Sequence, residues 1–346
     1  MADKKQQLQV LAYLRQQAQF CSLSKIRAQM SDIPERTLRR WLVAWVDSGL
    51  VERQGKGRST QYRSYESPLL LGFLAHLDED LKSSLLSQIR DLWTHHSTAL
   101  EGNTLTLGDT HFLLEEGLTI SGKPLKDHQE VVGHAKAIEL VYHGLQHDVS
   151  ETLLFQLHHA VQQELVNDIY KPIGDWKLEV NGTYAITAES EQTFIQYASP
   201  TDVPTLMAEW IQRVNAIDHR LITVDNAPSV YAKLHMGFVH IHPFWDGNGR
   251  MTRLLANIPL LKAGLPPLMI TQELRREYIS VLSAYQIAVG LLTSARGVWP
   301  ITEQLTDFET FCTGAYQKTH KLVAAMEKIQ KERDENSEPT IGSNDK

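Results

Sequence analysis

The segment HPFWDGNGRMTR holds a histidine, an aspartate, a Gly-Asn-Gly turn and two arginines. Gly247, Asn248 and Gly249 come directly before a run with helical spacing, and a helix N-terminus presents unpaired N–H groups with a partial positive charge. Glycines let an anion approach that backbone closely. Arg250 and Arg253 lie three positions apart, so both leave one face of the first turn. Two guanidinium groups beside such a turn predict a site for a polyphosphate.

Two more side chains in this segment could do chemistry. Asp246 offers a hard carboxylate oxygen, which suits a Mg²⁺ ion that bridges phosphate oxygens. His242 lies four residues earlier, and the ordinary pKa of an imidazole is close enough to neutrality for it to take a proton from a hydroxyl. The residues together predict transfer of a phosphate-linked group to a hydroxyl that His242 activates. The alternative is an ordinary helix start with surface charges.

The elements around this segment are mostly helices. Apolar residues recur at helical spacing through most of the chain after residue 66. The stretch 173–200 differs, because β-branched and aromatic residues flank turn signals there, and it predicts a β-hairpin. The fold class is therefore mainly α with a small hairpin. The predicted helices are 77–100, 110–117, 126–147, 150–165, 203–218, 227–240, 250–262, 273–292 and 303–333.

The first 66 residues differ from the rest in charge. They contain twelve Lys and Arg against six Asp and Glu, so +6, and the whole chain carries −7, which leaves −13 for the remainder. Apolar spacing predicts helices at 5–18 and 35–47, with the segment SLSKIRAQM as a further helix between them, and two short β-like runs flank the turn GKGR. Two units with different partners follow from this charge division.

The order helix, helix, helix, hairpin resembles a winged helix-turn-helix domain. That resemblance implies binding to double-stranded DNA, with helix 35–47 in a major groove and the hairpin on phosphates. The residues implied are Arg36, Arg39 and Arg40 on the helix, and Lys56 and Arg58 on the hairpin. Winged domains also mediate protein contacts, so that alternative stays open.

Composition excludes several classes of protein. The chain has 346 residues, of which 42% are hydrophobic and 22% are charged, which is typical of a globular protein of two domains. No apolar run is long enough for a membrane span, and the N-terminus lacks the apolar core of a secretory signal. Cys21 and Cys312 are far apart and show no metal-like spacing. We therefore expect a cytoplasmic protein without a membrane partner.

The sequence from His242 to Arg253 resembles the full signature of the Fic family of nucleotidyltransferases. The family implies a helical core and transfer of AMP from ATP to a hydroxyl of a protein, with release of pyrophosphate. His242 would deprotonate the hydroxyl and Asp246 would hold Mg²⁺. Gly247, Asn248 and Gly249 would bind the α-phosphate, and Arg250 and Arg253 the outer phosphates. The stretch 173–200 resembles the family's hairpin, which aligns the target by strand addition, with Lys177 where family members often carry arginine.

A second motif, STALEGN, ends a predicted helix at residues 97–103. Ser97 and Glu101 are four positions apart and share a face, and Gly102 suits a helix C-cap. Beside the Fic signature, this pattern resembles the family's inhibitory motif, in which the glutamate pairs with the second signature arginine, here Arg253. An arginine paired in this way cannot bind the γ-phosphate, and the carboxylate repels a triphosphate.

These resemblances predict four regions: a winged helix-turn-helix at 1–66, a Fic domain with an N-terminal inhibitory helix at 67–300, a C-terminal helix at 301–331 and a disordered tail at 332–346. The predicted activity is a self-inhibited protein adenylyltransferase. Its substrates would be ATP and a Tyr, Thr or Ser hydroxyl of an unknown target, or of the protein itself. One alternative is a DNA-binding regulator whose Fic domain senses a nucleotide. Another is an enzyme that removes AMP or uses a different nucleotide. Homodimerisation is compatible with either domain type.

Overall fold

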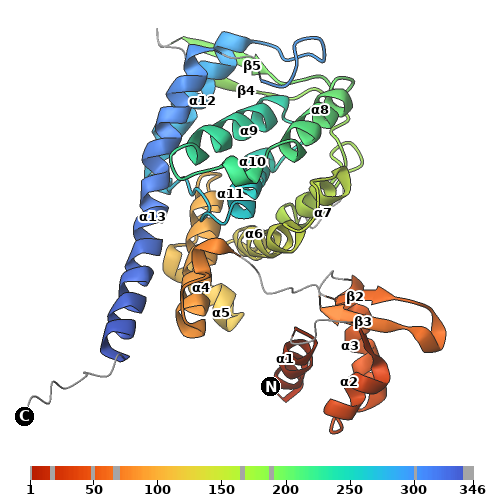
Figure 1. Cartoon of the computed structure of the whole chain (residues 1–346). Helices are drawn as coiled ribbons and strands as arrows, with labels where there is room; N and C mark the ends of the chain where they lie inside the picture. The colour runs from red at the N-terminus through yellow and green to blue at the C-terminus, as the bar shows by residue number, and fades with distance from the viewer. Residues whose placement is uncertain are drawn as a thin grey trace, which may run out of the picture. The chain divides into compact units, whose positions relative to one another are not determined.

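The structure is a computed structural model, and it describes residues 2–15, 20–47, 51–64, 71–163, 168–186, 191–299 and 302–337. The chain divides into two compact units, Met1–Leu70 and Leu71–Lys346 (Figure 1). The division falls four residues after the boundary predicted at 66. No helix within the described residues combines the length and the apolarity needed to cross a membrane.

The first unit packs its helices against a small antiparallel sheet. The sheet has the strand order β1-β3-β2. Helix α3 buries Leu38, Trp41, Leu42 and Trp45 on one face, as their helical spacing requires, and leaves its arginines on the other. The elements are α1 (Ala2–Arg15), β1 (Cys21–Ser22), α2 (Leu23–Gln29), α3 (Glu35–Asp47), β2 (Val51–Gln54), the 3-10 turn η1 (Gly57–Ser59) and β3 (Gln61–Ser64).

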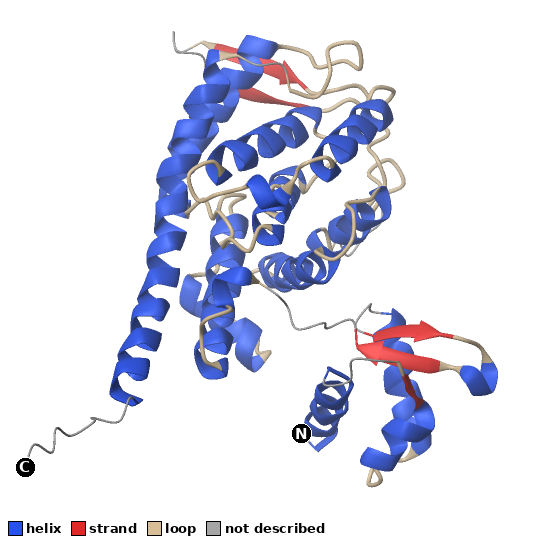
Figure 2. Cartoon of the chain, in the orientation of Figure 1, coloured by secondary structure: helices blue, strands red, loops and turns tan. Residues whose placement is uncertain are grey.

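The second unit is helical, with one antiparallel hairpin among its described residues (Figure 2). This arrangement confirms the predicted mainly α class and the hairpin within 173–200. Its helices are α4 (Glu79–Ala99), α5 (Leu107–Glu116), α6 (Leu125–Gly144), α7 (Glu151–Val161), α8 (Val203–Asn215), α9 (Ala227–Ile241), α10 (Asn248–Leu255), α11 (Ile258–Lys262), α12 (Arg275–Val289) and α13 (Glu303–Ser337), and its strands are β4 (Gly182–Ile186) and β5 (Gln192–Gln196). The 3-10 turns are η2 (Gly72–Leu74), η3 (His219–Leu221) and η4 (Gln272–Leu274).

Helix α9 lies at the centre of the second unit. It packs against α8, α10 and α13 (Figure 1), and most of its residues are buried, with Lys233 exposed and Ser229 and Val230 partly exposed. Its sequence, APSVYAKLHMGFVHI, is mostly apolar, which is typical of a helix with neighbours on most sides. The indole N–H of Trp210 on α8 donates to the carbonyl of Leu234 at 3.0 Å and joins the two helices. A helix held in this way gives a rigid base for the loop that follows it.

Two predicted helix boundaries need correction. The single helix expected at 250–262 begins at Asn248 and divides into α10 and α11, because Pro259 has no N–H to continue the first ladder. The side chain of Asn257 fills the break by donating to the carbonyl of Arg253 at 2.9 Å. Helix α13 continues to Ser337, so residues 332–337 are helical where disorder was expected. The rest of that tail, 338–346, lies outside the described residues.

Candidate active site

His242 ends α9 in a backbone conformation that side chains rarely adopt. Its φ of 54° and ψ of 59° are left-handed, and among the described residues it alone combines a positive φ with a side chain. The ring nitrogen Nδ1 lies 3.1 Å from the carbonyl of Val239, which can only accept, so Nδ1 carries the hydrogen and Nε2 keeps its lone pair. Backbone strain of this kind persists where the surrounding structure enforces it, typically at functional sites.

The environment of His242 keeps its imidazole neutral. The ring stacks on Tyr197, with centroids 3.7 Å apart and planes at 1°. Burial and the positive charge of Lys177 lower the pKa of His242 to about 3. The side chain therefore stays unprotonated throughout the neutral range, with Nε2 able to accept a proton.

Asn248 braces the loop between His242 and α10. Its Oδ1 accepts from the N–H of Phe244 at 3.0 Å, and its Nδ2 donates to the carbonyl of the same residue at 2.9 Å. Phe244 is fully buried and stacks on His158, with centroids 3.9 Å apart. The amide of Asn248 thus shapes the loop, and only its backbone N–H is left to face an anion.

Asp246 directly precedes Gly247, the N-cap residue of α10. Its Oδ1 accepts from the N–H of Gly247 at 2.6 Å, and its side chain is 54% exposed. Burial alone would raise the pKa of this carboxyl, but the charge of Arg250 and two hydrogen bonds lower it on balance. An ionised carboxylate with exposed lone pairs fits Mg²⁺, which commonly binds through one or two carboxylates together with substrate phosphates.

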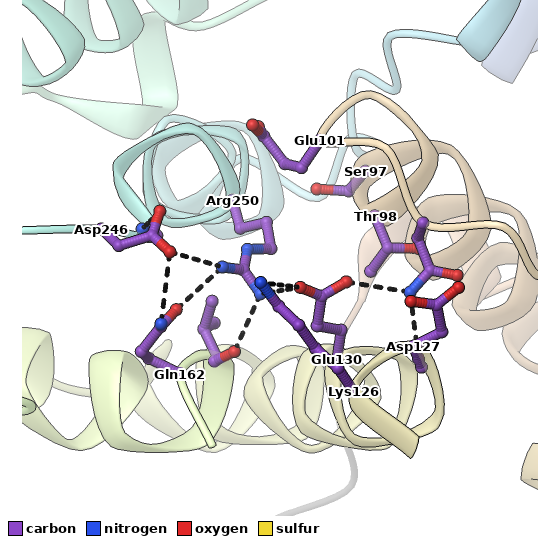
Figure 3. A network of polar contacts seen from close by, with 12 residues as sticks. Ser97, Thr98, Glu101, Lys126, Asp127, Glu130, Gln162, Asp246 and Arg250 are labelled. Atoms are coloured by element: carbon purple, nitrogen blue, oxygen red, sulfur yellow. Dashed lines mark hydrogen bonds and ion pairs between the residues drawn. The ribbon is translucent and has the colours of Figure 1, made fainter. Parts of the chain in front are cut away.

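Arg250 differs from the expectation that both signature arginines face the outer phosphates. Its guanidinium is 3% exposed and points toward α6 and α7, away from Glu101 (Figure 3). It donates to Gln162 Oε1 at 2.8 Å and to the carbonyl of Val161 at 3.1 Å, and it lies 3.7 Å from Glu130. Among the described residues, its Nε has no hydrogen-bond partner.

Arg253 is held by the end of α4. Its Nη2 donates to Glu101 Oε1 at 2.6 Å and to the carbonyl of Ser97 at 2.8 Å, and its Nε donates to the hydroxyl of Ser97 at 3.0 Å. Burial opposes the charge of this guanidinium, but Glu101 outweighs burial and raises the pKa of Arg253. Gly102 follows with a φ of 102°, which turns the chain immediately after the glutamate. The structure therefore brings Glu101 and Arg253 together, as the inhibitory pattern implied, and Ser97 also contacts Arg253.

Glu101 also fills the space beside the first turn of α10. A Cβ atom added to Gly249 would collide with Glu101 Oε1, so only glycine fits there while the glutamate is in place. The first backbone N–H groups of α10 point toward the same region, because a helix leaves them without internal partners. The carboxylate of Glu101 therefore lies beside the first turn of α10.

The base of the hairpin contributes residues that the motif did not indicate. Lys177 is 1% exposed, and its Nζ donates to Asn181 Oδ1 at 2.6 Å. Asn181 donates in turn to the carbonyl of Phe244 at 3.1 Å, and the N–H of Lys177 donates to the carbonyl of Pro243 at 2.9 Å. Burial lowers the pKa of Lys177 to about 7. Only the comparison with family hairpins singled out Lys177, because no local spacing links it to a loop more than sixty residues later.

The five basic residues proposed for DNA lie in the other unit. Arg36 and Arg40 are exposed on α3, and Lys56 is exposed just before η1. Arg39 is exposed but paired, since its Nε and Nη2 both donate to Glu35 Oε1, at 2.9 and 2.8 Å. The side chain of Arg58 lies outside the described part of the structure.

Residues 148–260 match the sequence profile of the Fic/DOC family. This segment runs from α7 into α11, so the match includes the hairpin, the His242 loop and α10, which carry the candidate site.

Two relatives in other organisms are named protein adenylyltransferases. Protein adenylyltransferase fic-1 of Caenorhabditis briggsae is 31% identical over 192 residues, which is 55% of this chain and 36% of that protein. Protein adenylyltransferase Fic of Nematostella vectensis is 29% identical over 70% of this chain and 54% of its own length. The chain therefore spans about a third to a half of the length of these relatives.

A solved structure shares the fold. A Fic domain-containing signaling protein from Bacteroides thetaiotaomicron superposes with a TM-score of 0.63 at 27% identity, and the match covers 74% of this chain and 94% of that one. Residues 134–508 of Fic-1 from Caenorhabditis elegans superpose with a TM-score of 0.52 at 22% identity, over 88% of this chain and 77% of that one. That second likeness concerns the fold alone.

Proposed function

We propose that the chain is a protein adenylyltransferase, which moves AMP from ATP to a hydroxyl side chain of a target protein. One observation carries the proposal: a neutral His242, with Nε2 free to accept a proton, lies on a braced loop that leads directly into the N-terminus of α10. This arrangement places a base beside a backbone that favours phosphate. The names of the curated relatives favour the same activity.

In the proposed reaction, the hydroxyl oxygen of the target attacks the α-phosphorus of ATP. A phosphorus–oxygen bond forms, the bond from the α-phosphorus to the oxygen that bridges to the β-phosphate breaks, and pyrophosphate leaves. Nε2 of His242 takes the hydroxyl proton. Backbone N–H groups of Asn248 and Gly249, at the start of α10, stabilise the negative charge on the α-phosphate. Asp246 would hold Mg²⁺, which supplies charge neutralisation on the phosphates when bound.

The proposal assigns an inhibitory role to Glu101. Its carboxylate pairs with Arg253 at 2.6 Å and fills the space beside Gly249, so the outer phosphates of ATP meet an occupied arginine and a like charge. Replacement by glycine removes both obstacles. The second candidate direction is removal of AMP, which Glu101 could support together with the proposed Mg²⁺ ligand Asp246 and the base His242. Incubation with an AMP-modified target distinguishes removal of AMP from its transfer.

Label transfer from α-³²P-ATP tests the proposal. Full-length protein with Glu101→Gly should label itself or proteins of a cell lysate in the presence of Mg²⁺, and γ-labelled ATP should give no label. If labelled protein arises from γ-labelled ATP instead, the enzyme transfers phosphate. If neither gives label while ATP binds, the adenylyltransferase proposal fails.

We also propose that the first unit is a winged helix-turn-helix domain and that it binds double-stranded DNA. The supporting observation is that Arg36 and Arg40 are exposed on one face of α3, four positions apart, in a unit with a charge of +6. The test of DNA binding uses double-stranded DNA of random sequence. Fluorescence anisotropy follows its binding at several salt concentrations. Arg36→Ala and Arg40→Ala should each reduce the salt slope by about 1. Arg39→Ala is the matched control, because Glu35 already pairs with that side chain.

A further inference from the structure

The C-terminal end of α7 meets the start of α10 through several polar groups. His158 and Gln162 lie four positions apart at this end, so they share one face. Each is almost completely buried, with exposures of 1% and 5%. Both contact Asp246, and the carbonyl of Val161 between them accepts from Arg250.

His158 holds the main chain of Asp246. Its Nδ1 accepts from the N–H of Gly174 at 2.8 Å, so the other ring nitrogen, Nε2, carries the hydrogen and donates to the carbonyl of Asp246 at 3.1 Å. Stacking on Phe244 at 3.9 Å fixes the plane of the ring.

Gln162 holds the side chain of Asp246. Its Nε2 donates to Asp246 Oδ2 at 3.3 Å, while its Oε1 accepts from Arg250 Nη2 at 2.8 Å (Figure 3). Asp246 Oδ2 and Arg250 Nη2 are themselves 4.0 Å apart, beyond hydrogen-bond distance. The amide therefore bridges the two groups and keeps the guanidinium from closing directly on the carboxylate.

We infer that His158 and Gln162 are positioning residues for the metal ligand of the proposed reaction, and that they orient the Asp246 carboxylate toward Mg²⁺. The inference rests on the proposed function. A carboxylate that is half-exposed on a loop would otherwise rotate or pair with Arg250, and either movement would turn its lone pairs away from a metal. Hydrogen bonds from outside the ligand shell fix such orientations, and their loss typically lowers metal affinity about 10–100-fold.

The variants follow from the geometry. Gln162→Met keeps the length of the side chain but loses both the donor and the acceptor. Gln163→Met is the matched control, because it makes the same change at the exposed neighbouring residue. His158→Phe keeps a ring to stack on Phe244 but loses both the N–H to Asp246 and the acceptor for Gly174, so it tests the inference independently if the first variant folds poorly.

The experiment measures the binding of α,β-methylene ATP by calorimetry, with EDTA and over a Mg²⁺ titration, in full-length protein with Glu101→Gly. Mg²⁺ should increase the affinity for the nucleotide, and half of this increase is reached at a certain Mg²⁺ concentration. We expect Gln162→Met and His158→Phe each to raise that concentration by about tenfold. Affinity in EDTA should stay within twofold, and Gln163→Met should match the parent. Equal losses with and without Mg²⁺, or no loss, would overturn the inference alone. If Mg²⁺ fails to tighten binding in the parent, the metal role in the proposed function fails as well.

Discussion

Removal of the charge at Glu101 should increase affinity for ATP. In the structure, its Oε1 lies 2.6 Å from Nη2 of Arg253, whose side chain is 3% exposed, while the glutamate side chain is 40% exposed. Two unit charges about 4 Å apart interact by about 4 kcal/mol at an effective dielectric constant of about 20. Solvent around the exposed part of the glutamate screens the pair, which leaves about 1.5–3 kcal/mol. That range corresponds to about a tenfold to hundredfold gain in affinity.

The assay compares wild type, Glu101→Gln and Glu101→Gly, with calorimetric binding of α,β-methylene ATP and Mg²⁺. Glu101→Gln keeps the atoms beside Gly249 but loses the charge, so it isolates the electrostatic part. Glu101→Gly also empties the space, and it should bind the nucleotide at least as tightly as Glu101→Gln. Equal affinity of all three proteins within twofold would refute the reasoning. A gain in the glycine variant alone would assign the inhibition to space rather than to charge.

Three further predictions follow from the site. His242→Ala in the Glu101→Gly protein should lower the rate of AMP transfer by at least about 100-fold with unchanged nucleotide affinity, since only the base is lost; a parallel loss of binding would contradict this role. Asn248→Ala should lower the free energy of unfolding, measured by urea titration, by about 2–4 kcal/mol, because the buried N–H and carbonyl of Phe244 lose their partners. An effect under about 1 kcal/mol would mean that other contacts hold the loop. Burial lowers the pKa of His134 and of His235 well below the ordinary value near 6.5. As the pH falls, these histidines therefore bind protons in the unfolded chain before they do so in the folded protein. The free energy of unfolding should then fall as the pH decreases below about 6.5, by up to about 1.4 kcal/mol per pH unit for each histidine. Urea titrations at pH 7.5 and 5.5 check that direction, and unchanged stability would contradict it.

Apolar spacing predicted the helices of the second unit well, because each buries a stripe against α9 or its neighbours. It failed where a single residue decides a boundary. Pro259 interrupts the ladder between α10 and α11 without changing the apolar pattern around it. The end of α13 was placed too early for a different reason, since a polar composition at 332–337 does not prevent a long helix from continuing.

The separate roles of the two signature arginines could not be read from their spacing. A step of three residues ends about 60° short of a full helical turn, so neighbouring side chains on one face can still lean toward different partners. Arg253 leans toward α4 and meets Ser97 and Glu101, whereas Arg250 leans toward α7 and meets Gln162. Those partners are between 88 and 156 positions away in the chain, and only the fold brings them near.

The central claim is tested most directly by label transfer from α-³²P-ATP in wild type, Glu101→Gly and Glu101→Gly/His242→Ala. Strong labelling in Glu101→Gly, weak labelling in wild type and none in the double variant is the predicted result. Labelling that persists in the double variant, or that is as strong in wild type as in Glu101→Gly, would contradict the roles given to His242 and Glu101.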